Sequence, residues 1–211
     1  MDTVADAGTA RASLIHVLQS ACSGELAAGY AYRGHWKSLR TSSPARERIR
    51  SIEAEEWHHR ELVLGMLSEL GAGPKRMREA VFWTIGKTIG LLCHIGGWFI
   101  PMFGAGRLER WNIVEYENAA RFAKEAGLDR MIDCLLMMSE VEWEHERFFR
   151  EQIAGHALLR VFPLWDAPPP KESIRAEHSA LTPPVVWPLR DARDTKIERV
   201  PAHERVREIE R

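Results

Sequence analysis

The feature that most constrains the fold of this chain is a pair of Glu-x-x-His motifs on otherwise apolar helical stripes. Glu56-Trp57-His58-His59 and Glu142-Trp143-Glu144-His145 repeat this spacing about 86 positions apart. Residues three apart on a helix point the same way, so the Glu and the His of each motif can bind one metal ion. Two such motifs therefore indicate two ions.

The residues around each motif decide which acid belongs to the pair. Steps of three and four residues give two stripes in which only the Glu and the His are polar: Ile49, Ile52, Glu56, His59, Val63, Met66, Leu70 and Met131, Leu135, Met138, Glu142, His145, Phe149. The alternative frame, Glu55 with His58, aligns with polar residues and is placed beside the site. Burying these groups costs several kcal/mol each unless something compensates, and a hydrogen-bonded core pair is the alternative to a metal.

Single acids on two further stripes complete the predicted ligand set. Glu25 lies amid Ile15, Leu18, Cys22, Gly29, Tyr32 and Trp36, and Glu115 lies amid Leu108, Trp111, Asn118 and Phe122. Glu117 is the fallback on the latter helix. Four carboxylates and two imidazoles inside a four-helix bundle form a carboxylate-bridged two-metal site, and this donor set suits iron, with manganese as the alternative. The predicted ligands are Glu25, Glu56, His59, Glu115, Glu142 and His145.

Breakers in the sequence divide residues 1–158 into four helices. We expect helices at about 9–40, 44–70, 106–126 and 128–158, with Ser43-Pro44 capping the second, Gly71 to Pro74 ending it and Gly127 closing the third. Short joins within each pair predict two antiparallel hairpins, and a long crossover at 77–105 connects them. The predicted fold class is therefore all-α, a four-helix bundle with a tail.

The tail, residues 159–211, is rich in proline and is predicted to form an extended arm. Pro168-Pro169-Pro170 and Pro183-Pro184 prevent regular helix, while Trp165 and Trp187 supply apolar anchors that pack on the bundle or on a neighbour. A short charged helix is expected at 205–211.

The crossover carries no formal charge from Thr88 to Ala105. This stretch is shorter than a membrane span and contains His94, a Gly pair and Pro101, so we do not expect it to cross a membrane. One interpretation is that it covers the bundle surface. We favour the other, in which 81–105 contacts a membrane interface peripherally through Trp83 and Trp98.

Composition places few further limits on function. The net charge of -1 gives no global reason to expect a nucleic-acid partner, and the sequence has no basic patch with interleaved aromatics of the kind that binds nucleic acid. The three cysteines form no zinc-type spacing and are expected to be reduced. The N-terminal residues lack a secretory pattern, so we expect a cytoplasmic location, on the inner face where a membrane is contacted.

Several segments resemble the demethoxyubiquinone hydroxylase family of the ferritin-like superfamily. Residues 23–35, Ser-Gly-Glu-Leu-Ala-Ala-Gly-Tyr-Ala-Tyr-Arg-Gly-His, are similar to its first-helix metal segment. Glu56 with His59, Val114-Glu115 and Glu142 to His145 resemble the motifs of its other helices. The likeness covers about residues 12–152. The His-rich segment after the family's third-helix Glu and the acid at position 141 are missing, and the tail has no counterpart.

The resemblance implies a di-iron monooxygenase that uses O2 and a reductant to hydroxylate a lipophilic aromatic or quinone-like substrate. Glu56 and Glu115 would be the bridging carboxylates, although sequence leaves the choice open, and Glu55 or Glu140 would accept a hydrogen bond from a ligand histidine. One alternative is an iron-oxidising, iron-binding or peroxide-reducing ferritin-like protein. Another is a helical scaffold that binds a partner through its tail. Self-association into a homo-oligomer is compatible with each.

Overall fold

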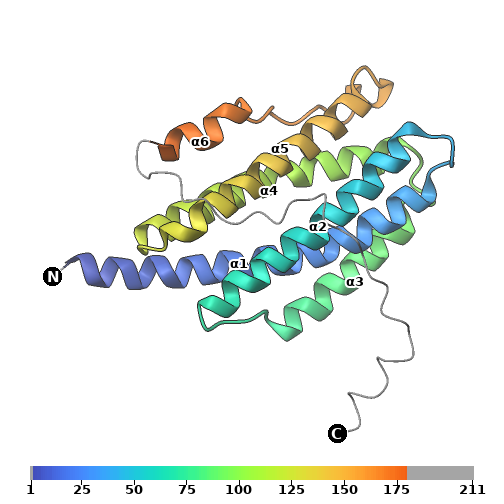
Figure 1. Ribbon diagram of the computed structural model, residues 1–211. Coiled ribbons are helices and arrows are strands. Elements are labelled where there is room, and N and C mark those ends of the chain that lie inside the picture. The colour runs from blue at the N-terminus through green and yellow to red at the C-terminus, as the bar shows by residue number, and fades with distance from the viewer. Residues whose placement is uncertain (1, 180–211) are drawn as a thin grey trace, which may run out of the picture.

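A computed structural model describes residues 2–179, and the side chains of residues 7–176. The described chain is helical, with no strand among these residues, which confirms the all-α prediction (Figure 1). Its elements are α1 (Asp2–Ser38), α2 (Pro44–Glu69), α3 (Arg76–Leu92), α4 (Phe99–Glu125), the 3-10 turn η1 (Asp129–Met131), α5 (Ile132–Ile153), the 3-10 turn η2 (Ala157–Arg160) and α6 (Lys171–Ser179).

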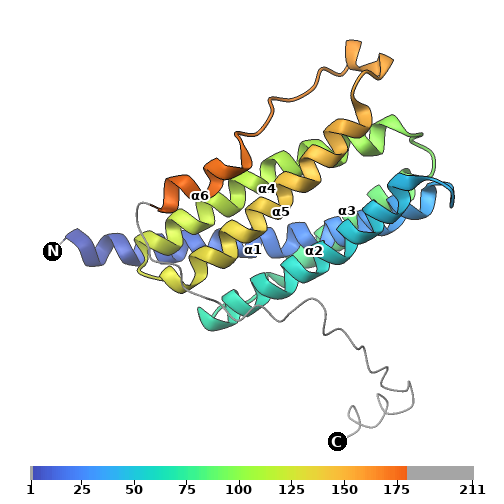
Figure 2. The same ribbon diagram turned by 45° about the horizontal axis from the view of Figure 1, so that its top comes forward.

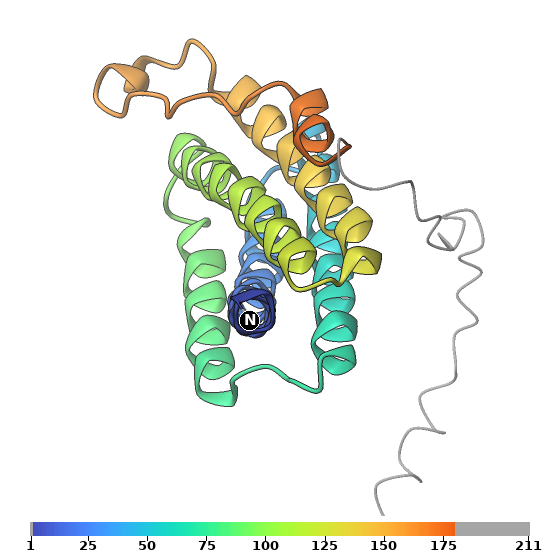
Figure 3. The same cartoon turned by 90° about the vertical axis from the view of Figure 1, so that its left-hand side faces the viewer.

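Four long helices, α1, α2, α4 and α5, surround a common interior. The most extensive contacts join α4 to α5 and α1 to both α2 and α3. Figure 3 shows α1 between α2 and α3, with α4 and α5 packed together across from it. Two apolar clusters fill the interior, one around Leu67, Tyr116 and Leu135 and the other around Ile52, Met102 and Phe149. Between these clusters, along the four long helices, lie the buried residues Glu25, Glu56, Glu109 and Glu142.

Glycines end two of the helices as predicted. Gly71 after α2 and Gly127 after α4 have φ of 65° and 68°, a left-handed conformation that favours glycine. At both ends the next residue's N–H donates back to the helix, from Ala72 to Leu67 and from Leu128 to Ala123, each at 2.8 Å. Ser43 does precede Pro44 at the start of α2, but its side chain makes no capping hydrogen bond, so that part of the prediction was wrong.

The predicted crossover, 77–105, is mostly helix. α3 takes up its first half, and α4 begins at Phe99, about two turns earlier than expected. α3 packs on α1 through Gly86 and Gly90. A Cβ on Gly86 would meet the backbone of Ala27, and one on Gly34 would meet the backbone of Gly90, so these helices approach more closely than side chains would allow.

The outer face of α3, the turn that follows it and the first residues of α4 expose large apolar side chains. Met77 and Ile95 are 84% and 80% exposed, and the same surface carries Val81, Trp83, Ile85, Ile89, Leu91, Leu92, Trp98 and Ile100. No helix in the described part of the chain has the length and apolar character needed to cross a membrane.

The first part of the tail packs on the bundle, as expected, but it is not entirely extended. Figure 2 shows the chain running back from the end of α5 to α6. Ile174 of α6 joins the core, the Trp143 Nε1–H donates to Pro169 O, and Arg175 binds Asp133 and Glu140. Helix is permitted here because Lys171–Ser179 follows the last proline of the Pro168–Pro170 run and contains none. The predictions for Trp187 and for 205–211 lie outside the described residues.

Candidate metal centre

Six polar side chains from four helices meet in the middle of the interior. They are at most 3% exposed: Glu25 of α1, Glu56 and His59 of α2, Glu109 of α4, and Glu142 and His145 of α5. Five of the six predicted ligands are among them. We refer to these six residues as the acid–imidazole cluster.

The acid–imidazole cluster divides into two overlapping groups of potential ligands. Glu25, Glu56, His59 and Glu142 form one group, and Glu56, Glu109, Glu142 and His145 form the other. Within each group the ligand atoms lie within 4.8 Å of one another. Because Glu56 and Glu142 belong to both, they are placed to bridge two ions. Glu25 with His59, and Glu109 with His145, are placed to serve one ion each.

Both imidazoles direct Nδ1 toward the carboxylates. His59 Nδ1 lies 2.8 Å from Glu142 Oε1, and His145 Nδ1 lies 3.2 Å from Glu56 Oε1 and 3.4 Å from Glu142 Oε2. Neither Nδ1 is aligned for a hydrogen bond. A metal ion between these atoms would give each nitrogen a partner.

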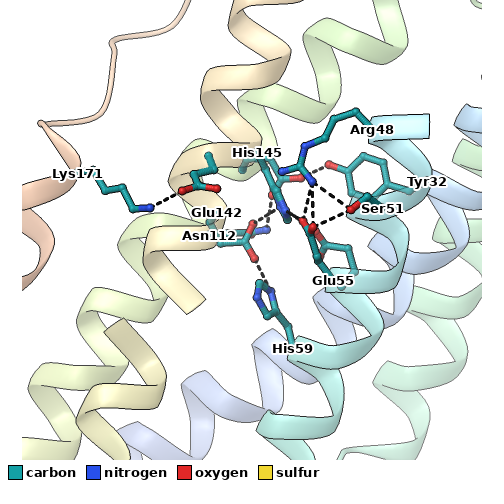
Figure 4. A network of polar contacts seen from close by, with 12 residues as sticks. Tyr32, Arg48, Ser51, Glu55, His59, Asn112, Glu142, His145 and Lys171 are labelled. Atoms are coloured by element: carbon teal, nitrogen blue, oxygen red, sulfur yellow. Dashed lines mark hydrogen bonds and ion pairs between the residues drawn. The ribbon is translucent and has the colours of Figure 1, made fainter. Parts of the chain in front are cut away.

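Glu55 contacts the other side of the His145 ring. Its Oε2 lies 2.5 Å from His145 Nε2, and Arg48 and Ser51 donate hydrogen bonds to the same carboxylate (Figure 4). Glu55 therefore holds the ring with Nδ1 facing the cluster, the arrangement common to histidine ligands. Of the two acids predicted for this role, Glu55 has it, whereas Glu140 binds Arg175.

Two buried tyrosines donate hydrogen bonds to Glu25 and Glu109, which we call the outer carboxylates because each belongs to only one ligand group. The Tyr116 hydroxyl donates to Glu25 Oε1, and the Tyr32 hydroxyl donates to Glu109 Oε1. The Asn112 amide adds a hydrogen bond of 3.0 Å to Glu109 Oε2. Each outer carboxylate is thus oriented by a neutral donor that leaves its charge in place. Tyr30, the third tyrosine of the chain, instead packs edge-on against Trp57 and Trp83.

The charges in the cluster are balanced only in part by its own members. Burial, together with repulsion from Glu142, raises the pKa of Glu56 and of Glu109 well above the usual range, and burial also raises that of Glu25. Burial opposes ionisation of Glu142, yet the adjacent His145 and His59 lower its pKa well below the usual value. The pKa of His145 is raised well above normal, since attraction to Glu142, Glu55 and Glu56 outweighs the opposing effect of burial.

Other buried acids of the chain have conventional partners. Glu53 accepts hydrogen bonds from Arg33 and Trp36, and Glu146 accepts them from Arg150 and Trp165. No lysine or arginine of the described residues pairs with a carboxylate of the acid–imidazole cluster, and both oxygens of Glu56 and of Glu142 lack a hydrogen-bond partner. Four carboxylates match the charge of two divalent cations. The donors therefore fit a pair of oxygen-preferring ions such as iron or manganese.

Glu115, the sixth predicted ligand, lies outside both groups, and Glu109 occupies the place expected for it. Glu115 is only partly buried, near Ser20 and Arg78. The predicted stripe on this helix was wrong because Leu108 and Trp111 face outward, 57% and 68% exposed. Glu117, the fallback, is in neither group.

A seven-residue step through α4 would have found Glu109. Met102, Glu109 and Tyr116 are all buried, and Ala105, Ile113 and Ala120 lie on the same side. The signal was weak because much of this face consists of alanine and glycine. The late predicted start at 106 also put Glu109 in the first turn of the helix instead of its interior.

Comparisons of the chain with protein-family models, with curated proteins and with solved structures found no match.

Proposed function

We propose that this chain is a ferritin-like di-iron oxidoreductase, an O2-dependent hydroxylase that acts on a lipophilic aromatic or quinone-like substrate. The observation that supports it most is the pair of overlapping ligand groups sharing Glu56 and Glu142. A single buried ion pair would not need four carboxylates from four helices. Two ions bridged by shared carboxylates account for all six side chains.

The proposed reaction needs an external reductant. A bound iron pair supplies the redox chemistry for O2 activation. One oxygen atom enters the substrate and the other leaves as water, with two electrons and two protons taken up from the reductant and solvent. Within the protein, Tyr32 and Tyr116 keep Glu109 and Glu25 oriented, and Glu55 keeps His145 facing the cluster.

The exposed apolar surface of α3 supports the proposal that the substrate is lipophilic. It argues against an iron-storage cage, because the subunits of such a cage need a polar outer face. We propose that α3, the turn after it and the start of α4 up to Ile100 contact a membrane interface, with Trp83 and Trp98 near its polar boundary. Lys75, Arg76 and Lys87 are exposed on or beside the same helix, where they suit anionic headgroups.

Substrate turnover tests the hydroxylase. Protein loaded with ferrous ion, chemically reduced and supplied with isotopically heavy O2 and a short-chain methoxyquinone or a lipid extract should give a product carrying one heavy oxygen atom. Glu109→Gln should abolish the incorporation. Oxidation of iron with no labelled organic product would contradict the hydroxylase and favour the iron-oxidising alternative.

Liposome flotation tests the membrane contact. Trp98→Glu and Ile85→Glu should each reduce binding to vesicles that contain anionic lipid. Ser68→Glu, which adds the same charge on an exposed position of α2, should leave binding unchanged. Unchanged partitioning of Trp98→Glu would refute the contact. If the wild type is a dimer in size-exclusion chromatography and Trp98→Glu is a monomer, the apolar surface would be assigned to self-association instead.

A further inference from the structure

The face of α4 opposite the acid–imidazole cluster borders the tail. A pocket of about 430 Å³ opens between α4 and residues 163–166 of the tail. Glu109 is 1% exposed and points inward, whereas Arg107 and Trp111 on the same helix are exposed and border the pocket. None of the six cluster residues lines it. Its size falls in the range of small-molecule sites, roughly 300–1,000 Å³.

Aromatic side chains form one wall of the pocket and are held firmly. Phe103 and Trp165 meet edge to face, with ring centroids 5.3 Å apart. The Trp165 indole donates to Glu146 Oε1 at 2.6 Å, and the Arg150 guanidinium lies 5.0 Å from its ring centroid. Gly106 lets this ring lie directly on the α4 backbone, because a Cβ there would come within 2.8 Å of Trp165. The wall is therefore built before any ligand arrives.

Two arginines supply the charge. Arg107 and Arg110 line the pocket, and neither guanidinium group makes a hydrogen bond or ion pair with the rest of the described chain. Arg60 and Arg150, by contrast, form ion pairs with Glu79 and Glu146. Asp166 is the only acid in the lining and contacts neither arginine within ion-pair distance. The pocket therefore has an excess of positive charge beside an aromatic wall.

We propose that this pocket binds an aromatic anion. Its planar ring would lie against Phe103, Trp111 and Trp165, and its carboxylate or sulfonate would accept paired hydrogen bonds from Arg107 and Arg110. The neutral analogue of such a ligand would make the ring contacts but would leave the guanidinium groups without a partner. Charge is thus the property by which the pocket selects.

Two fluorescent probes of matched shape test the proposal on the full, metal-loaded chain. Anilinonaphthalene sulfonate should bind roughly tenfold or more tightly than neutral phenylnaphthylamine. Arg107→Gln/Arg110→Gln should remove that preference and leave the affinity for the neutral probe unchanged. Asp166→Asn should strengthen sulfonate binding several-fold, since it removes the opposing charge.

Arg147→Gln provides the control, because Arg147 is an exposed arginine of α5 that pairs with Glu151. It should bind both probes as the wild type does. Equal affinity of the wild type for the two probes would overturn the proposal. So would sulfonate binding that survives in the double variant, which would place the probe on another surface such as the outer face of α3.

Discussion

Glu55 of α2 and His145 of α5 meet at 2.5 Å, Oε2 to Nε2, on the side of the imidazole that faces away from the carboxylates of the acid–imidazole cluster. Burial would raise the pKa of Glu55, but the contact with His145 and the nearby Arg48 lower it to about 2, so the carboxylate stays charged at neutral pH. A charged acceptor on Nε2 fixes the tautomer that leaves Nδ1 free to bind a metal.

Glu55→Gln should therefore weaken metal binding without removing a ligand. We expect a loss of about 10–100-fold in affinity at the ion held by His145, measured by competition with a chelator. Glu140→Gln is the matched control, since Glu140 is a nearby acid that binds Arg175 and not a histidine of the cluster. Equal affinities for Glu55→Gln and the wild type would show that the contact does not orient a ligand.

Glu109 and Glu115 lie six residues apart on α4, and substituting them should have different effects on the metal content. Glu109→Gln removes one anionic ligand and should lower the bound metal from two ions per chain toward one. Glu115→Gln should leave it at two, because Glu115 lies outside both ligand groups. Elemental analysis of the purified variants distinguishes them. Loss of metal in Glu115→Gln but not in Glu109→Gln would support the ligand predicted from sequence and contradict the ligand groups of the structure.

The contact between α1 and α3 depends on glycine. Gly34→Ala would place a Cβ against the backbone of Gly90, and we expect the free energy of unfolding to fall by about 1–3 kcal/mol or more. Gly65→Ala on α2 is the control. No heavy atom lies within 4 Å of its added Cβ, so it should stabilise the protein by up to about 1 kcal/mol. Urea unfolding compares the two, and a Gly34→Ala protein as stable as wild type would mean that the helices are less closely packed than described.

His35 should make the metal-free protein sensitive to acid. It is 2% exposed, its Nε2 has no hydrogen-bond partner, and burial lowers its pKa from 6.5 to about 4. The free energy of unfolding is therefore greatest above pH 6.5, where the imidazole is neutral in both states. As the pH falls from 6.5 toward 4, the unfolded state binds a proton that the folded state does not, so the folded state loses stability. At about 1.4 kcal/mol per pH unit the loss is on the order of 3 kcal/mol.

His35→Gln cannot titrate and should lose less stability than the wild type between pH 7 and 4, measured by urea unfolding with a chelator present. His16→Gln, at an exposed position of α1, should follow the wild-type pH dependence. Parallel curves for the wild type and His35→Gln would show that the buried imidazole does not contribute.

The parts of the fold that strong local signals specify were predictable from sequence. Gly71 and Gly127 end helices because the left-handed conformation costs glycine little, and both ends were located correctly. Glu56 and His59 were assigned to the interior because Ile49, Ile52 and Val63 around them are large and apolar, and all three are fully buried.

The errors arose where burial depends on tertiary contacts. The buried face of α4 consists largely of small residues such as Ala119 and Ala120, while Leu108 and Trp111 are exposed, so hydrophobicity indicated the wrong face. The packing of α3 on α1 rests on Gly86 and Gly90, which give no apolar periodicity. α6 was not predicted because it lies in a proline-rich segment, directly after Pro168–Pro170. Ile174 and Arg175 hold it against α5 through contacts with residues distant in sequence.

The metal content of the protein, expressed in iron-replete medium and purified without chelators, tests the two-metal centre most directly. We predict two iron ions per chain for the wild type, and a clear loss in Glu56→Ala, which removes a carboxylate common to both ligand groups. Fewer than one iron or manganese ion per chain in the wild type, or an unchanged content in Glu56→Ala, would contradict the assignment of the acid–imidazole cluster as a two-metal centre.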